Sequence, residues 1–318
     1  MGNAKNAGKT TVLNALVRAH PDVTLGLSSI GLDGEQLDTV SFLPKPRVHV
    51  PAGTLVATAR DCVKQSDAVL QELEELDIRT GLGSIVVARV TKPGNVLLGG
   101  PSTTQGMENA LASMGRHGAQ KLLIDGAFAR QSHAATTQAL VYVGGAHRSP
   151  DMQQVVRSAG LALKRMALPE APEEARFLLE EQRLGWLDDS ADFHPLDVHT
   201  SLGQAEKLLD SLPASARWLY VPGAVTDGLA QRLVERRAEH RAGLILQSPL
   251  SLVVEDAVLR RLFRLNRPIV VLRPMTTAFV AYNPCSPAGH RFDSQAFREA
   301  LAQQTSLPLI NVAEEDSI

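Results

Sequence analysis

Short apolar runs that alternate with helix-type patterns are the feature of this sequence that most restricts its fold. Strands are predicted at 23–31, 84–90, 119–127 and 138–146, and again at 218–225, 242–249, 267–274 and 307–312. Helices are predicted at 54–76, 102–117 and 151–166. Strands that alternate with helices form parallel sheets covered by helices on both faces. The sequence therefore predicts an α/β fold.

A proline-rich stretch divides this pattern. The segment "ALPEAP" covers residues 167–172, and a second series of strands follows it. With 318 residues the chain is long enough for two domains. We predict a nucleotide-binding domain at 1–168 and a smaller α/β domain at 169–318, which would bind a partner or a substrate.

The segment "GNAKNAGKTT" at residues 2–11 matches a variant of the phosphate-binding loop. Its roles fall on Gly8 for close backbone approach, Lys9 for the outer phosphates and Thr10 for Mg²⁺. Gly2 and Gly8 enclose five residues, whereas the usual motif encloses four. A Gly/Asn-rich tail that fits the motif by chance is the alternative.

The residues after this loop predict a helix. Val12, Leu13, Leu16 and Val17 fall on one helical stripe, so the loop would lead into a helix N-terminus that favours an anion. Phosphate-loop proteins have a strand in front of the loop, but here only Met1 precedes Gly2. We expect the missing strand to be encoded upstream of Met1, in a longer form of the chain.

Carboxylates follow two of the predicted strands. Asp125 ends the apolar run "KLLID", where a phosphate-loop protein holds Mg²⁺ through water. Asp33, Glu35 and Asp38 follow the strand at 23–31, and Asp33 is the candidate for activating water. An ordinary turn at Asp125 and a solvated acidic loop at 33–38 are the alternatives.

Composition excludes several classes of function. The formal net charge is −2, which gives no reason to expect nucleic acid or a membrane surface as a partner. Cys62 and Cys285 form no metal-ligand spacing, and two cysteines suit a reducing compartment. We expect a cytoplasmic protein. The Asn-Lys-x-Asp stretch of guanine-binding proteins does not occur, which favours ATP over GTP.

Four segments resemble one protein family. These are "GNAKNAGKTT", "SIGLDGEQLDTVSFLPKPRVHVPAGTLVAT", "LLIDGA" and "NPCSPAGHRFD", and they resemble the ATPase subunit of the reactivase of adenosylcobalamin-dependent lysine 5,6-aminomutase. The loop itself resembles that of dethiobiotin synthetase, including an extra lysine, here Lys5. The resemblance implies an ATPase that works with a second subunit to exchange inactivated cobalamin out of a client aminomutase.

The resemblance also assigns roles to residues. It implies that Gly8, Lys9, Thr10 and Thr11 bind ATP and that Asp125 holds Mg²⁺. Together with the motif itself, the candidate ATP-binding residues are Gly2, Lys5, Gly8, Lys9, Thr10 and Thr11, the candidate Mg²⁺ ligands are Thr10 and Asp125, and the candidate catalytic residues are Lys9 and Asp33. Two other functions remain open. One is an ATP-dependent ligase that acts on a small carboxylate, and the other is a regulatory protein that does not hydrolyse nucleotide. A homodimer also remains open.

Two further motifs have structural alternatives. Lys45 and Arg47 in "LPKPR" could contact a partner protein, or they could be ordinary surface cations. Cys285 and His290 in "YNPCSPAGHRFD" could suggest a metal site or a nucleophile. Tight turns in which Asn and Asp bond the backbone are the favoured interpretation of that segment.

Overall fold

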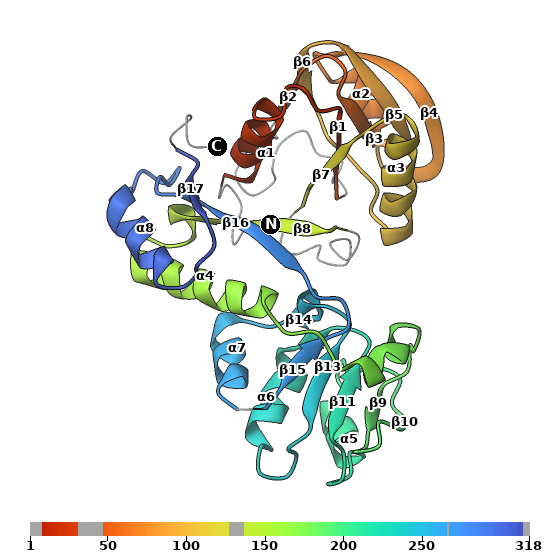
Figure 1. Cartoon of the computed structure of the whole chain (residues 1–318), viewed down its shortest axis with the longest axis vertical. Coiled ribbons are helices and arrows are strands. Elements are labelled where there is room, and N and C mark those ends of the chain that lie inside the picture. The colour runs from red at the N-terminus through yellow and green to blue at the C-terminus, as the bar shows by residue number, and fades with distance from the viewer. Residues whose placement is uncertain (1–7, 31–46, 127–136, 266, 314–318) are drawn as a thin grey trace.

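The structure is a computed structural model of the chain, and it describes residues 8–30, 47–126, 137–265 and 267–313. Figure 1 shows three groups of strands, with the N-terminal group at the top, a small group in the middle and a third group at the bottom. Each group is packed against helices. The protein is therefore a mixed α/β protein, as the sequence predicts.

The N-terminal sheet has five strands in the order β4-β5-β3-β1-β7. They are β1 (Leu25–Ser29), β3 (Leu55–Ala59), β4 (Val69–Thr80), β5 (Gly83–Lys92) and β7 (Lys121–Asp125). β1 is parallel to β3 and β7, whereas β5 is antiparallel to β3 and β4. Every residue of β1 and β3 is buried, as expected for strands covered on both faces.

Two helices cover opposite faces of this sheet. Leu13 and Val17 of α1 (Lys9–Arg18) belong to the same buried cluster as Val56 of β3. Met114 of α3 (Thr104–Arg116) belongs to a different cluster with Leu55, the neighbouring residue of β3. Because successive side chains of a strand point to opposite faces, α1 and α3 lie on opposite sides. The helices predicted at the phosphate loop and at 102–117 are confirmed.

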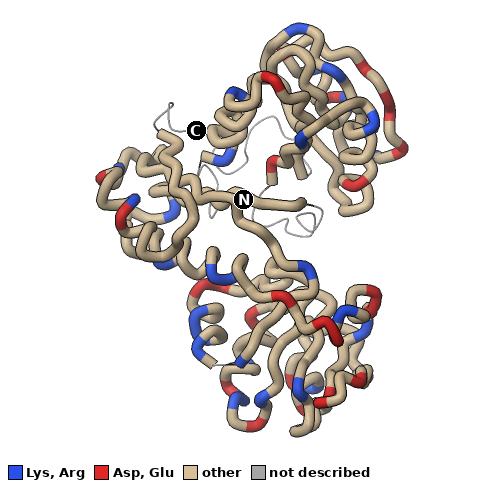
Figure 2. The backbone as a smooth tube through the Cα atoms, viewed as in Figure 1, with Lys and Arg blue, Asp and Glu red and all other residues tan. Residues whose placement is uncertain are grey.

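The helix predicted at 54–76 is wrong. This segment forms β3, the short helix α2 (Arg60–Lys64) and the first part of β4. The three-residue spacing of Leu70, Leu73 and Leu76 resembles a helical stripe, but irregularities in the pairing of β4 with β5 keep these residues partly buried along a strand. The acidic residues of β4 form red segments on the edge of the sheet in Figure 2.

The middle sheet joins distant parts of the chain. Its order is β17-β16-β8, and all three strands are parallel. They are β8 (Ala139–Gly145), β16 (Thr276–Asn283) and β17 (Leu309–Asn311). Tyr142 of β8 and Phe297 of α8 (Ser294–Ala302) share a buried cluster with Val155 of α4 (Met152–Met166). The predicted division at 168/169 stays a prediction, although β8 and β16 pair across it.

The C-terminal sheet has the order β10-β9-β11-β13-β15. Its strands are β9 (Gly185–Leu187), β10 (Phe193–Pro195), β11 (Trp218–Val221), β13 (Gly243–Leu246) and β15 (Ile269–Val271). The parallel strands β11, β13 and β15 lie together, and the antiparallel β9 and β10 complete one edge. Helices α5 (Ala205–Asp210), α6 (Asp227–Glu235) and α7 (Asp256–Phe263) share its main buried cluster.

The remaining elements are short. They are β2 (Val48–Val50) paired with β6 (Gly94–Val96), β12 (Val225–Thr226) paired with β14 (Leu252–Val253), and the 3₁₀ turns η2 (Ala146–Arg148), η3 (Glu173–Leu179) and η4 (Pro249–Ser251). In the part of the chain that the structure describes, no helix combines the length and the apolar character needed to cross a membrane.

Candidate functional site

The N-terminus of α1 lies where the carboxyl ends of several strands meet. Gly8 is the residue that precedes α1, and its φ of 102° is in the left-handed region, which favours glycine. A Cβ atom at Gly8 would lie 3.2 Å from Cγ2 of Val312 and 3.4 Å from Nδ2 of Asn283. Asn283 ends β16 and Val312 follows β17. The start of α1 is therefore fitted closely against the middle sheet.

Gly8 has no side chain that could cap the start of α1. Backbone N–H groups in the first turn of a helix and the helix dipole both favour an anion at this position. Thr10 in this turn is partly buried, and Thr11 is exposed. The first turn of α1 therefore has the general helix-terminus geometry that favours an anion.

The charges of Lys9 and Asp125 interact near the start of α1. Burial lowers the pKa of Lys9. The charge of Asp125 acts the other way, but the pKa of Lys9 remains below its usual value. Burial likewise raises the pKa of Asp125, and Lys9 opposes that shift. For both groups the cost of burial exceeds the mutual attraction. A ligand that carries both an anion and a cation would stabilise both charged forms.

Asp125 is positioned by the pairing of β7 with β1. It lies opposite Ser29 in the parallel register, and its carbonyl oxygen accepts a hydrogen bond of 2.9 Å from the N–H of Ile30. The carboxyl ends of β1 and β7 are therefore held together. Asp125 is held there near enough to Lys9 for their charges to interact.

A hydrogen-bonded loop at residues 97–100 supports the carboxyl end of β1. The Ser29 hydroxyl donates to the carbonyl oxygen of Leu98 and accepts from the N–H of Gly100, at 2.9 and 3.1 Å. The Thr58 hydroxyl accepts from the N–H of Gly99 at 2.8 Å. Buried hydroxyls whose partners are backbone groups fix the main chain. Sequence reasoning missed Ser29, Thr58 and Gly100, and only the apolar run around Ser29 marks its strand.

The Cys285–His290 segment is built of turns. The Asn283 side chain accepts a hydrogen bond of 2.9 Å from the N–H of Cys285, and His290 Nε2 lies 2.7 Å from the carbonyl oxygen of Ala146. Among the residues that the structure describes, no three His, Cys, Asp or Glu side chains are grouped as a metal site would require. The favoured interpretation of this segment as tight turns is confirmed.

The structure brings together some of the predicted site residues and leaves others outside the described ranges. Lys9, Thr10 and Thr11 lie in the first turn of α1, and Lys9 interacts electrostatically with Asp125. Gly2, Lys5, Asp33, Glu35, Asp38 and Lys45 lie outside the described residues. Arg47 forms an exposed ion pair of 2.9 Å with Asp67.

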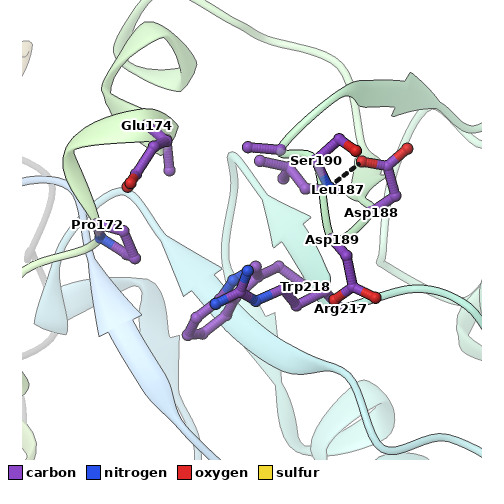
Figure 3. A pocket seen from close by; sticks show the side chains of 10 residues that line it. Pro172, Glu174, Leu187, Asp188, Asp189, Ser190, Arg217 and Trp218 are labelled. Carbon is purple, nitrogen blue, oxygen red and sulfur yellow. Dashed lines mark hydrogen bonds between the residues drawn. The ribbon is translucent and has the colours of Figure 1, made fainter.

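A separate cavity of about 270 Å³ lies in the C-terminal part of the chain. Figure 3 shows Pro172 and Glu174 on one side, a loop with Asp188 and Ser190 on the other, and Trp218 and Arg217 below them. Asp188 has its own partners, because it accepts from the N–H of Ser190 and interacts with His194 at 2.9 Å. None of the described residues around Lys9 and Asp125 lines this cavity.

A comparison of the chain with known protein families, curated proteins and solved structures found no match.

Proposed function

We propose that this protein is an ATPase of the phosphate-loop class that binds ATP and Mg²⁺ at the N-terminus of α1. The supporting observation is the meeting of Lys9 with Asp125 at the start of α1, where each charge is disfavoured by burial and incompletely compensated by the other. A phosphate chain would interact with Lys9 and with the backbone N–H groups of the first turn of α1.

Two side chains fit Mg²⁺ in this proposal. Mg²⁺ prefers oxygen ligands and keeps several waters, and the Thr10 hydroxyl and the Asp125 carboxylate are oxygen donors of that kind, on the residue after Lys9 and on a residue that interacts with Lys9. The ion would supply positive charge next to the phosphates. Asp125 would hold the water shell of the ion, and Lys9 would offset negative charge on the terminal phosphate. Asp33, the candidate for orienting the attacking water, lies outside the described residues.

We further propose that ATP drives reactivation of a cobalamin-dependent aminomutase, together with a second subunit. This part of the proposal rests on the sequence resemblance. A reactivase must use nucleotide binding to shift a protein between two states, which requires different nucleotide affinities in the two states. Client binding must then change nucleotide affinity by the same factor.

Hydrolysis of ATP by the purified chain tests the first part. We expect Mg²⁺-dependent hydrolysis, and Lys9→Met should lower its rate by about 100-fold or more, the scale for removing one group that stabilises transition-state charge. Lys64→Met is the matched control, because Lys64 is exposed on α2 and forms an ion pair with Asp61. Equal rates in Lys9→Met and in the wild type would remove Lys9 from the site.

Reactivation of an aminomutase tests the second part. The expected result is that cobalamin-inactivated aminomutase regains activity only with this protein, its second subunit, ATP, Mg²⁺ and fresh adenosylcobalamin. Recovery without ATP would contradict the reactivase proposal. Turnover that appears only with a small carboxylate, and not with the client enzyme, would indicate a ligase instead.

A further inference from the structure

The cavity of about 270 Å³ in the C-terminal part of the chain has walls from three segments. One is the start of η3, another is the hairpin loop between β9 and β10, and the third is the start of β11 (Figure 3). Pockets for drug-sized ligands measure about 300–1,000 Å³. A cavity just below that range suits a small metabolite.

Part of the cavity wall is apolar and belongs to the packed interior. Ala175 and Leu187 are members of one buried cluster, and Ala191 and Trp218 pack against that cluster. The indole ring of Trp218 fits closely over Gly243 of the adjacent strand, because a Cβ atom at Gly243 would lie 2.5 Å from the ring. These residues give the cavity a fixed apolar surface for the body of a ligand.

Asp188 fixes the shape of the hairpin loop. Its carboxylate accepts hydrogen bonds of 2.9 Å from the N–H of Ser190 and 3.0 Å from the N–H of Asp192. The same carboxylate lies 2.9 Å from Nε2 of His194. The loop also holds Ala191 at a φ of 64°, which few residues other than glycine adopt. Asp188 therefore has its partners within the hairpin, and the shape of this wall does not depend on a ligand.

Three charged side chains line the cavity without a partner of their own. They are Arg217, Glu174 and Asp189, and within the described residues none of their side chains forms an ion pair or a hydrogen bond. Arg183, which lies nearby in the sequence and does not line the cavity, pairs with Glu181 at 2.6 Å. Charges of both signs therefore line one small cavity and do not pair with each other.

The main chain at Arg217 is held on both sides. Its N–H donates a hydrogen bond of 2.9 Å to the carbonyl oxygen of Leu187, and its carbonyl oxygen accepts one of 2.9 Å from the N–H of Gly243. Figure 3 shows Glu174 on one side of the cavity and Asp189 on the other, with Arg217 below them. The cavity thus offers a guanidinium group to a carboxylate and two carboxylates to an ammonium group.

We propose that this cavity binds a free amino acid whose carboxylate contacts Arg217 and whose ammonium group contacts Glu174 and Asp189. The apolar part of the amino acid lies against Leu187 and Trp218. A ligand with only one of the two charges would leave the opposite charge of the cavity without a partner, so it binds more weakly. The inference goes beyond the nucleotide site and holds whether or not ATP binds at α1.

Heat unfolding of the full chain with each of the common α-amino acids, β-alanine and γ-aminobutyrate gives the first test. At least one of them should raise the unfolding midpoint in a saturable way at millimolar concentration, because a ligand of the folded chain stabilises it. Its carboxamide lacks the negative charge and its deamino analogue lacks the positive charge. Each analogue should bind at least about tenfold more weakly in titration calorimetry. No effect from any amino acid, or equal affinity for either analogue, would overturn the proposal.

Substitutions give the second test, because they assign the two charges to residues. Arg217→Gln should remove the preference for the amino acid over its carboxamide. Glu174→Gln combined with Asp189→Asn should remove the preference over the deamino analogue. Arg176→Gln is the matched control, since Arg176 is exposed on η3, pairs with Glu173 and does not line the cavity. Either preference that survives in the corresponding folded variant would overturn the proposal, and if a variant does not fold, the comparison of analogues on the wild type still decides.

Discussion

The substitution Gly100→Ala is expected to destabilise the N-terminal sheet beside the candidate site. A Cβ atom at Gly100 would overlap the carbonyl oxygen of Ser29 and lie 2.6 Å from the Ser28 hydroxyl oxygen. The Ser29 carbonyl oxygen belongs to the main chain of a fully buried strand, so no change of side-chain rotamer can relieve the overlap. The loop at residues 97–100 must therefore move away from β1.

Overpacking and one broken hydrogen bond determine how large this effect is. Overpacking in a close-packed interior costs about 1–3 kcal/mol. The displaced loop would also break the hydrogen bond from Gly100 N–H to the Ser29 hydroxyl, which is 3.1 Å long, and such bonds contribute about 1 kcal/mol. We therefore expect the free energy of unfolding of the N-terminal sheet to fall by about 2–4 kcal/mol.

Urea unfolding with two probes provides the assay. Both tryptophans, Trp186 and Trp218, lie in the C-terminal sheet, so their fluorescence follows that part of the chain. Hydrogen exchange of β1 and β3 follows the N-terminal sheet. Gly100→Ala should lower protection of β1 and β3 far more than it shifts the fluorescence midpoint.

Gly115→Ala is the matched control for this prediction. It makes the same chemical change inside α3, where a Cβ atom would meet no atom of the described chain within 4 Å. Alanine is favoured over glycine in helices by about 1 kcal/mol, so this variant should be as stable as the wild type or more stable. Unchanged protection of β1 in Gly100→Ala would refute the reasoning about close backbone approach.

Three further predictions concern polar groups that folding removes wholly or partly from water. His240 is buried, and neither of its ring nitrogens has a hydrogen-bond partner among the described residues. Its pKa is lowered, first by burial and then by the charge of Arg236. Arg267 lowers this pKa further, whereas Glu239 and Asp210 raise it without reversing the shift. The unfolded chain therefore protonates His240 at a higher pH than the folded chain does, so the free energy of unfolding should fall as pH drops below about 6.5. His240→Leu should reduce this fall, measured as urea midpoints by tryptophan fluorescence. Asp125→Asn should raise the hydrogen-exchange protection of β7 at neutral pH without ligand. Burial raises the pKa of Asp125, so its ionised form disfavours folding. Lower protection of β7 in this variant would contradict the reasoning. Tyr220→Phe should lower the free energy of unfolding by about 1–2 kcal/mol in the same fluorescence assay. The Tyr220 hydroxyl accepts a hydrogen bond of 2.6 Å from Gln247 Nε2 and donates one of 2.9 Å to the Leu178 carbonyl oxygen. An unchanged midpoint would show that these bonds contribute nothing to stability.

The sequence predicted the elements in which local pattern and tertiary role agree. Apolar runs indicated the positions of β1, β7 and β8, and the stripe with Val12 and Leu13 indicated α1. In these segments, residues that favour a strand or a helix are also the residues that the core buries. The sequence placed Asp125 at the carboxyl end of a strand near the phosphate loop, and Asp125 does interact electrostatically with Lys9 of that loop.

The sequence failed where tertiary contacts override spacing. The run with Leu70, Leu73 and Leu76 has a helical period, but pairing with β5 makes it a strand with irregular register. Pairing of β8 with β16 joins residues more than a hundred positions apart, which no local pattern encodes. The contact of Gly100 with Ser29 depends on main-chain shape and has no sequence signature.

The Mg²⁺ dependence of ATP affinity is the sharpest test of the proposed nucleotide site. Titration calorimetry of the full chain with ATP, with and without Mg²⁺, should show tighter binding in the presence of the ion. Asp125→Asn should lose about tenfold or more of that increase, equivalent to about 1.4 kcal/mol, and should keep the affinity for metal-free ATP. Absence of ATP binding to the wild type, or an equal Mg²⁺ effect in Asp125→Asn, would contradict the proposed site.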